Sequence, residues 1–332
     1  MKFLIAGLGS IGRRHLRNLL ALGERDILLY RTHRASLPDD ELAGIPVETD
    51  LRDALAYHPE AVIISNPTAM HLDVAIPAAH CGCHILLEKP VSHSMARLEE
   101  LEQAVQLNGV KVLVGFQFRF HPGLQQVKQL RDEGAIGEPL SVRAHWGEYL
   151  PDWHPWEDYK LGYAARPELG GGVVLTLSHP LDYLRWLMGE VASLWAFTSH
   201  LGLNMPVEDL AEIGLRFENS ALGSLHLDYD QRPPSHTLEI TGRRGTIRWD
   251  NADGITRLAM VGVDDKAAPW QEFPPPPGFE RNRMFLDELS HFREVVRGEA
   301  EPVCTLQDGI QALRLALAAR QEQLVHFSPN SS

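Results

Sequence analysis

Three glycines near the start of the chain have the spacing of a phosphate-binding turn. Gly7, Gly9 and Gly12 follow a short apolar run, residues 3–6, in the order G-x-G-x-x-G. In such a turn the first glycine allows a sharp reversal, the second lets backbone approach a pyrophosphate, and the third lets helix pack on strand. The helix that follows directs unpaired N–H groups and its positive dipole end at the phosphates. The pattern predicts a dinucleotide site, although a tight strand-to-helix turn without a ligand would share it.

Polar side chains stand at the ends of two further apolar runs. Residues 61–65 lead into Asn66, and residues 84–87 lead into Glu88 and Lys89. Helical patterns separate these runs, and another strand is expected at 111–115. Strands that alternate with helices predict a parallel, doubly wound sheet with its ligand beyond the carboxyl ends of the strands. The three polar side chains are therefore expected at that edge.

The residues after the second strand indicate which dinucleotide is bound. An acid about 20 residues after the glycines binds the ribose 2′-hydroxyl and favours NAD. Here Arg31 stands 19 residues after Gly12, and residues 31–34 contain His33 and Arg34 but no acid. A 2′-phosphate would find cationic partners among them. The sequence favours NADP over NAD, and solvated loop cations are the alternative interpretation.

The second half of the chain has a different pattern. Strands are expected at 141–149 and 224–230 and as a hairpin over 237–249, and helices are expected at 174–188, 283–297 and 307–323. Strands gathered late in a chain indicate a mostly antiparallel sheet. The predicted fold is therefore α/β, with a doubly wound nucleotide-binding domain over residues 1–120 and an α+β domain with a large open sheet over residues 121–332. The second domain is expected to bind substrate, and its last helix to pack back on the first.

Composition narrows the classes of protein that remain. A length of 332 residues suits two domains of about 150 residues. The net charge of −13 argues against a nucleic-acid partner. Three cysteines are too few for a disulfide framework and indicate a reducing compartment. No signal-peptide pattern and no apolar run of about 18 residues is present, so a soluble cytoplasmic protein without a membrane partner is expected.

Several motifs together resemble the glucose-fructose oxidoreductase / inositol dehydrogenase (Gfo/Idh/MocA) family. They are GLGSIGRRH (7–15), SNPTAMH (65–71), EKPVS (88–92), GFQFRFHP (115–122), GAIGEP (134–139) and GGGVVLTLSHPLDYLRWLMG (170–189). The resemblance implies a Rossmann domain, and hydride transfer with NAD(P) at a secondary hydroxyl or keto carbon of a sugar, nucleotide sugar or cyclic polyol. It also implies that the open sheet forms homodimers or homotetramers. Residues 147–172 resemble the branch associated with bacterial surface-carbohydrate biosynthesis.

The resemblance implies catalytic roles for Lys89 and His179, which match the lysine of the E-K-P motif and the histidine of the second-domain helix. A neutral imidazole can take a hydroxyl proton, and an ammonium can stabilise the developing alkoxide. Many relatives carry an aspartate one turn before the histidine, where this chain has Leu175 and Thr176. The acid three residues after it is kept as Asp182. Either Asp182 or Thr176 is expected to orient the pair, and a surface ion pair is the alternative for Asp182.

The remaining candidates surround these residues. The cofactor-binding candidates are Gly7, Gly9, Ser10, Ile11, Gly12, Arg31, Arg34, Asn66, Pro67, His71, Glu88, Lys89 and Gln117, and the substrate-binding candidates are Arg119, Trp153, His154, Arg166 and Thr176. The two arginines would bind a negatively charged substrate or else form structural salt bridges. No metal is expected, since no ligand set near His179 is complete. A reductase of another carbonyl or imine, and a silent NAD(P)-binding sensor, are the alternative functions.

Overall fold

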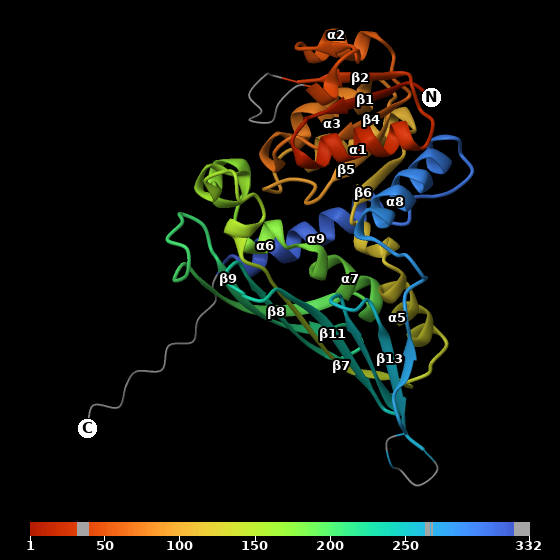
Figure 1. Ribbon diagram of the computed structural model, residues 1–332, viewed down its shortest axis with the longest axis vertical. Helices are drawn as coiled ribbons and strands as arrows, with labels where there is room; N and C mark the ends of the chain where they lie inside the picture. Colours follow the sequence, from red (N-terminus) through yellow and green to blue (C-terminus); the bar gives the residue numbers. More distant parts are fainter. Residues whose placement is uncertain (32–39, 263–265, 267, 322–332) are drawn as a thin grey trace.

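A computed structural model describes residues 1–31, 40–262, 266 and 268–321. Two sheets dominate this part of the chain, and helices lie around the first sheet and between the two (Figure 1). Arg34, one of the expected cofactor contacts, lies outside the described residues. None of the helices within these ranges is both long and apolar enough to cross a membrane.

The first sheet is the predicted doubly wound one. Its six parallel strands have the order β3-β2-β1-β4-β5-β6. They are β1 (Phe3–Ala6), β2 (Ile27–Tyr30), β3 (Val47–Glu48), β4 (Ala61–Ile64), β5 (His84–Glu88) and β6 (Val112–Gly115). Its helices are α1 (Ser10–Ala21), α2 (Leu51–Ala56), α3 (His71–His80) and α4 (Leu98–Asn108). The central strands β1 and β4 are buried throughout, as is typical of a parallel sheet covered on both faces.

The second sheet has eight strands in the order β14-β13-β12-β11-β7-β10-β9-β8. Only the β7 and β10 pair is parallel among these strands, so the predicted mostly antiparallel sheet is confirmed. Its strands are β7 (Pro139–Gly147), β8 (Val191–Ser199), β9 (Leu210–Phe217), β10 (Leu222–Asp228), β11 (Ser235–Gly242), β12 (Gly245–Asp250), β13 (Thr256–Met260) and β14 (Gln271–Phe273). The expected hairpin is β11 and β12, with Gly242 paired to Gly245 at its turn. Strands β8, β9, β13 and β14 were not predicted.

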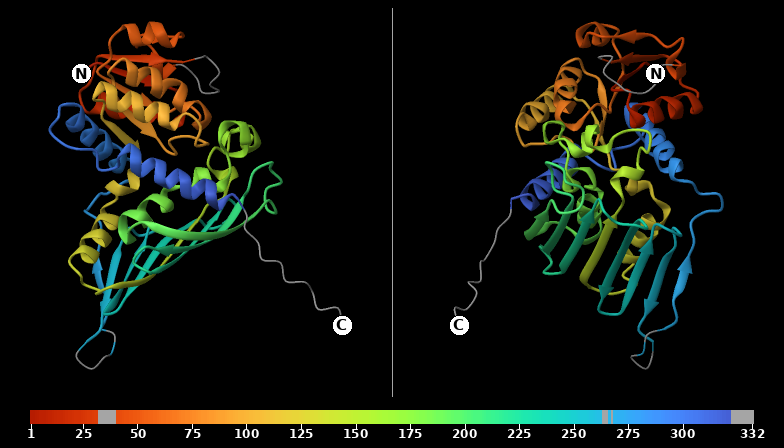
Figure 2. Two further views of the ribbon diagram at one scale, coloured as in Figure 1. Left: turned by 180° about the vertical axis from the view of Figure 1, so that it is seen from behind. Right: turned by 60° about the vertical axis from the view of Figure 1, so that its left-hand side comes forward.

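One face of the second sheet is covered and the other is open (Figure 2). The helices α5 (Pro122–Asp132), α6 (Val173–Thr176), α7 (His179–Met188) and α9 (Leu306–Ala319) pack on the covered face. On β8, Ala196 points into this core, while its neighbours Trp195 and Phe197 are about half exposed on the other face. No described helix covers that outer face.

The expected single helix over 174–188 is wrong, because the chain forms two helices there. Helix α6 ends at Thr176, and α7 begins at His179. Pro180 stands at the start of α7 and has no N–H to donate to the carbonyl of Thr176, four residues earlier. The break therefore leaves a backbone carbonyl available to another donor.

Two C-terminal segments join the halves of the molecule. Helix α8 (Arg281–Val296) packs on α1, and Arg293 bonds with Glu24 at 2.8 Å. Ahead of α9, the carbonyl of Cys304 accepts the N–H of Val114 in β6 at 2.9 Å. Helix α9 then runs between the two sheets (Figure 1). The carboxyl end of β6 is thereby held against the second domain.

Candidate functional site

The glycine turn connects β1 to α1 in the predicted conformation. Gly7 has φ +93°, and a Cβ there would lie 2.4 Å from the backbone nitrogen of Asn66. A Cβ on Gly12 would lie 2.0 Å from the carbonyl oxygen of Gly7. A Cβ on Gly9 would have no heavy atom within 4 Å. Packing therefore requires the first and third glycines, whereas the second faces open space that a phosphate can enter.

The first turn of α1 adds a favourable electrostatic environment to that space. The helix begins at Ser10, with Gly9 as its N-cap, and no acid lies in its first turn. Ser10 is exposed and Ile11 is half-buried. The free amides and the positive helix end fit an anionic dinucleotide. At the end of β2, Arg31 is largely buried, and its backbone N–H donates to the carbonyl of Glu48 at 3.1 Å.

His71 ties together the turns that follow β4 and β5. Its Nδ1 lies 2.9 Å from the carbonyl oxygen of Pro90, and its Nε2 lies 3.0 Å from that of Asn66. Burial lowers the pKa of His71 to about 4, so the neutral ring donates its single proton to only one of them. The amide of Asn66 donates to Met70, while its buried Oδ1 lacks a partner among the described residues. Pro67 continues this turn, and Oδ1 is available to a ligand.

Glu88 is bound within the protein rather than directed at open space. Its Oε1 lies 2.8 Å from Nε2 of His15 in α1, and its Oε2 accepts the N–H of Lys89 at 3.3 Å. Gln117 is buried in η3 (Gln117–Phe120), the short helix after β6. Both candidates therefore lie at the carboxyl end of the sheet, with Glu88 fixing the turn that carries Lys89.

Lys89 reaches from the first domain to the second. Its Nζ donates to the carbonyl oxygen of Thr176 at 2.6 Å, the carbonyl that Pro180 leaves free. Burial lowers the pKa of Lys89 to about 8, the charge of Glu88 opposes this shift, and the charge of Arg281 adds to it. The side chain of Thr176 is buried beside the hydroxyl groups of Tyr163 and Tyr229.

His179, the first residue of α7, is enclosed by aromatic rings. Its ring centroid lies 5.4 Å from Phe116, 5.0 Å from Phe118 and 5.6 Å from Trp146. Burial, and next the charge of Lys89, lower the pKa of His179 well below its usual value. The imidazole is thus neutral at physiological pH. The structure brings Lys89 and His179 into one site.

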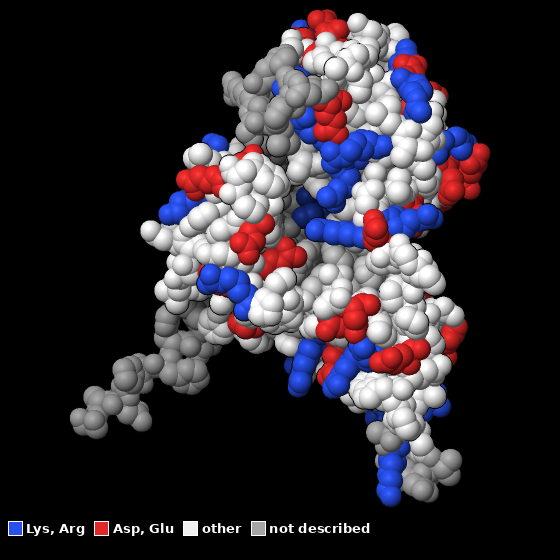
Figure 3. Space-filling model, in the orientation of Figure 1, with Lys and Arg blue, Asp and Glu red and all other residues white. Residues whose placement is uncertain are grey.

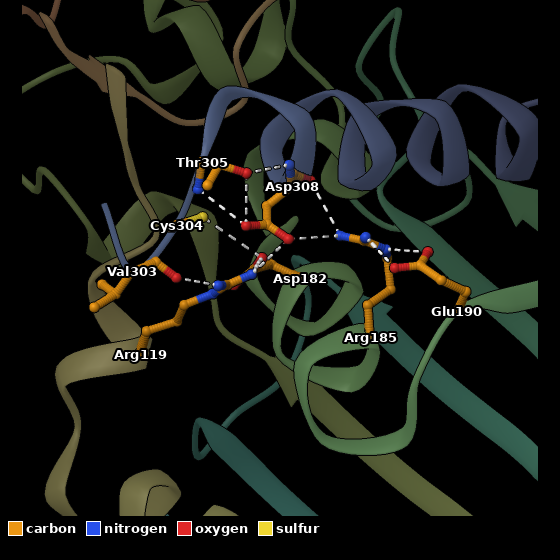
Figure 4. A network of polar contacts seen from close by, with 8 residues as sticks. All are labelled: Arg119, Asp182, Arg185, Glu190, Val303, Cys304, Thr305 and Asp308. Carbon is orange, nitrogen blue, oxygen red and sulfur yellow. Dashed lines mark hydrogen bonds and ion pairs between the residues drawn. The ribbon is translucent and has the colours of Figure 1, made fainter. Parts of the chain in front are cut away.

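Asp182 and Arg119 form a buried ion pair. Arg119 donates through two nitrogens to the two carboxylate oxygens of Asp182, at 2.9 and 2.6 Å, and both residues are buried. Figure 4 shows this pair within a wider network that includes Asp308, 3.4 Å from the same guanidinium. Within the described residues, no hydrogen bond or ion pair joins Asp182 to Lys89 or His179. The ion pair accounts for both charges.

The aromatic segment after β7 lies beside this region. Trp153 packs edge-on against Tyr229, with ring centroids 5.7 Å apart, and helps to line a pocket at the end of β7. The ring of His154 lies 5.3 Å from that of Trp156. Arg166 is partly exposed and donates to Glu168 at 2.7 Å. As with Arg119, its charge already has an acidic partner.

Two charged residues near Lys89 were missed in the sequence. Arg281 starts α8, is exposed, and lowers the pKa of both Lys89 and His179. No hydrogen bond or ion pair to Arg281 occurs within the described ranges. Glu148, which accepts from the indole of Trp146 at 2.8 Å, raises the pKa of Lys89. Figure 3 shows Lys and Arg side chains gathered around the hollow between the domains. Only the folding back of α8 reveals Arg281, since no motif includes it.

Comparisons with known proteins agree with this fold. A family model described as "Oxidoreductase family, NAD-binding Rossmann fold" matches residues 1–116, and the "GFO/IDH/MocA C-terminal domain" model matches residues 124–248. Levoglucosan dehydrogenase in complex with NADH and L-sorbose has the same fold, with a TM-score of 0.85 at 20% identity over 97% of this chain and 96% of that one. The WlbA dehydrogenase from Bordetella pertussis, in complex with NADH and UDP-GlcNAcA, has a TM-score of 0.80 at 24% identity over 97% and 95%.

Sequence relatives extend over almost the whole chain. The uncharacterized oxidoreductase YrbE of Bacillus subtilis is 31% identical over 96% of this chain and 92% of its own length. Myo-inositol 2-dehydrogenase of Thermotoga maritima is 28% identical over 97% of this chain and 96% of its own. The chain therefore belongs to the Gfo/Idh/MocA family of NAD-binding oxidoreductases, whose named relatives include dehydrogenases and reductases of sugars and inositols.

Proposed function

We propose that the protein is an NADP(H)-dependent oxidoreductase that acts at a secondary hydroxyl or keto carbon of an anionic sugar derivative. One observation carries this proposal. Lys89 donates a 2.6 Å hydrogen bond to the carbonyl oxygen of Thr176, in the segment that also carries His179. This meeting point lies at the carboxyl ends of the parallel strands, where ligands of doubly wound sheets bind. A sensor without chemistry would need neither side chain.

Lys89 is the proton-transfer group in this proposal. Since its pKa is about 8, ammonium and amine are both populated near neutral pH, as efficient acid–base catalysis requires. During alcohol oxidation the amine accepts the hydroxyl proton, and during ketone reduction the ammonium returns it. Bound nicotinamide supplies or accepts the hydride.

In this proposal the uncharged imidazole of His179 binds the same substrate oxygen as Lys89. Its lowered pKa makes it a weak base, so proton transfer passes to Lys89 and the imidazole orients the hydroxyl or stabilises the alkoxide. The aromatic rings around His179 fix its plane. Asp182 acts indirectly, because its ion pair with Arg119 anchors the start of α7.

The preference for NADP rests on Arg31 at the end of β2. It should be tested by measuring the dissociation constants of NADPH and NADH by fluorescence, in wild type and in Arg31→Asp. We expect the wild type to bind NADPH about tenfold more tightly or better, and the substitution to remove that difference. Arg25→Asp, at an exposed site before β2, is the matched control. Equal affinities in wild type would remove the argument for the 2′-phosphate.

The proposal of an anionic substrate rests on Arg281, a cation near the site that has no acidic partner among the described residues. Arg119 and Arg166 already pair with Asp182 and Glu168, and the pair of Arg119 is buried. Arg281 has no such partner in the described structure and acts electrostatically on Lys89 and His179. The structure of WlbA contains UDP-GlcNAcA, a nucleotide sugar and hence an anion. Arg281 is the residue that would bind a phosphate or carboxylate here.

A substrate screen tests the reaction. Nicotinamide absorbance is followed with NADP⁺ or NAD⁺ and a panel of uronic acids, nucleotide sugars, neutral sugars and inositols, and the reverse reaction is followed with keto sugars. Lys89→Ala should lose about 10²- to 10⁴-fold in turnover on every active substrate, whereas Lys160→Ala, at an exposed position, should not. Unchanged turnover in Lys89→Ala would refute the role of Lys89. Binding of NADPH without turnover of any compound would favour the sensor.

A further inference from the structure

A buried carboxyl group lies behind the Glu88–Lys89 turn and has no visible partner. Glu288 of α8 is 0% exposed, and neither of its carboxylate oxygens has a hydrogen-bond partner among the described residues. It faces Glu88 of β5 and His15 of α1, and one ligand atom from each of the three lies within 4.8 Å of the others. Three elements thus meet at this point.

The charges around Glu288 do not favour its ionised form beside the ionised Glu88. Glu88 already accepts from His15 at 2.8 Å and from the N–H of Lys89 at 3.3 Å. The titratable groups that interact electrostatically with Glu88 also include Arg14, His71, Lys89 and Tyr163, and the buried thiol of Cys304 interacts with Glu288. No cation contacts Glu288 in the described part of the chain. Burial and the neighbouring charge of Glu88 raise the pKa of Glu288 well above its usual value, because two adjacent buried carboxylates cannot both stay ionised.

We propose that Glu288 is a neutral carboxylic acid that donates its proton to Glu88, and that this hydrogen bond positions Lys89. Glu88 is then held from three sides, by α1, by its own strand end and by α8. Helix α8 carries both Glu288 and Arg281, so it fixes the turn from behind and places a positive charge near the Lys89 ammonium. The protonated state stands by itself, whereas the positioning role rests on the proposed function.

The protonated state is tested by the melting temperature of wild type and Glu288→Gln between pH 5 and 8. Glutamine keeps the shape and an N–H donor but does not titrate. Above the usual pKa of glutamate the unfolded chain releases a proton that the folded protein retains, so wild-type stability falls with pH relative to the variant. The variant should gain about 2–4 °C over wild type for each pH unit. Glu294→Gln, at an exposed position of the same helix, should show no such trend.

Two results would overturn the protonated state. One is a difference in melting temperature between wild type and Glu288→Gln that stays constant from pH 5 to 8, which would mean that Glu288 is ionised in the folded protein. The other is a wild-type melting temperature that rises with Zn²⁺ and falls with EDTA, with both effects absent in Glu288→Gln. That outcome would assign the cluster of His15, Glu88 and Glu288 to a divalent cation.

The positioning role is tested by turnover of Glu288→Gln and Glu288→Met. Glutamine should keep kcat within about threefold, whereas methionine, which cannot donate, should lower kcat about 10- to 100-fold with KM unchanged. Equal losses in the two variants would reject donation to Glu88 as the cause. If the wild type turns over no substrate, the proposed function fails, and the melting curves still decide the state of Glu288.

Discussion

Replacing Arg281 and Glu148 by glutamine, one at a time, should move the pH dependence of turnover in opposite directions. Arg281 lowers the pKa of Lys89, and Glu148 raises it. Without Arg281 the ammonium becomes more stable, so the inflection should move to higher pH. Without Glu148 it should move to lower pH. Because both side chains are accessible to water, each shift should be roughly a few tenths of a pH unit and should shrink at high salt.

Burial of Lys89 sets the position of the inflection. With the ordinary lysine pKa of 10.5, about one side chain in 3,000 is a neutral amine at pH 7, and with a pKa of about 8 about one in eleven is. The site therefore raises the population of the proton acceptor about 300-fold. For alcohol oxidation, kcat/KM should rise about tenfold per pH unit up to about pH 8 and then level off. For ketone reduction it should be level at low pH and fall above about pH 8, because the ammonium is the donor.

The assay is the initial rate of nicotinamide absorbance change between pH 6 and 10, at constant ionic strength and saturating cofactor. A weaker affinity of Arg281→Gln for an anionic substrate scales the whole curve without moving its inflection, so the two roles of Arg281 separate. Arg283→Gln is the matched control, since that exposed cation of the same helix pairs with Asp287 at 2.8 Å. Two outcomes would refute the assignment of the inflection to Lys89. One is the same inflection in wild type, Arg281→Gln and Glu148→Gln, and the other is an inflection that persists in the residual activity of Lys89→Ala.

Other parts of the structure give three further predictions. Asp182→Asn should lower the free energy of unfolding by about 3–5 kcal/mol in urea melts, because the buried Arg119 would keep only the more distant Asp308 as an acidic partner. The surface change Asp132→Asn should cost less than about 1 kcal/mol. Gly12→Ala should melt well below wild type, since its Cβ would meet backbone at 2.0 Å, whereas Gly9→Ala should melt normally and bind NADPH weakly. We expect the wild type to be a dimer or tetramer by light scattering and Trp195→Glu, on the outer sheet face, to be a monomer; a monomeric wild type, or a variant of unchanged mass, would contradict this.

The first domain could be predicted because its signals are local. Each strand of its centre is a continuous apolar run, and the positive φ at Gly7 demands glycine. In the second sheet those signals weaken. The burial pattern of β9 alternates except at Gly214, which lies under the indole of Trp195 from the adjacent strand. Glycine has no side chain to pack and is depleted in strands, so this interruption weakened the period-two pattern and β9 was not predicted.

Partners of charged side chains could not be predicted for a related reason. Arg119 was equally compatible with a substrate contact and a salt bridge, and only the packing of η3 against α7 supplies Asp182, 63 residues later. Arg281 lies still further from Lys89 in the sequence and reaches it because α8 folds back on α1. Sequence spacing specifies which residues share a helix or strand, but the charge at a site depends on which distant elements meet.

The break between α6 and α7 shows how one residue of the sequence can determine a contact between distant elements. An uninterrupted helix would use the carbonyl of Thr176 for a bond four residues ahead, and Lys89 would then meet an acceptor that is already occupied. Pro180 has no N–H, so that carbonyl stays free, and Lys89 donates to it at 2.6 Å. The same break makes His179 the first residue of α7, where the rings of Phe116 and Trp146 enclose it. Pro180, which made the prediction of one long helix wrong, thus allows the lysine of one domain to bind the segment of the other domain that carries His179.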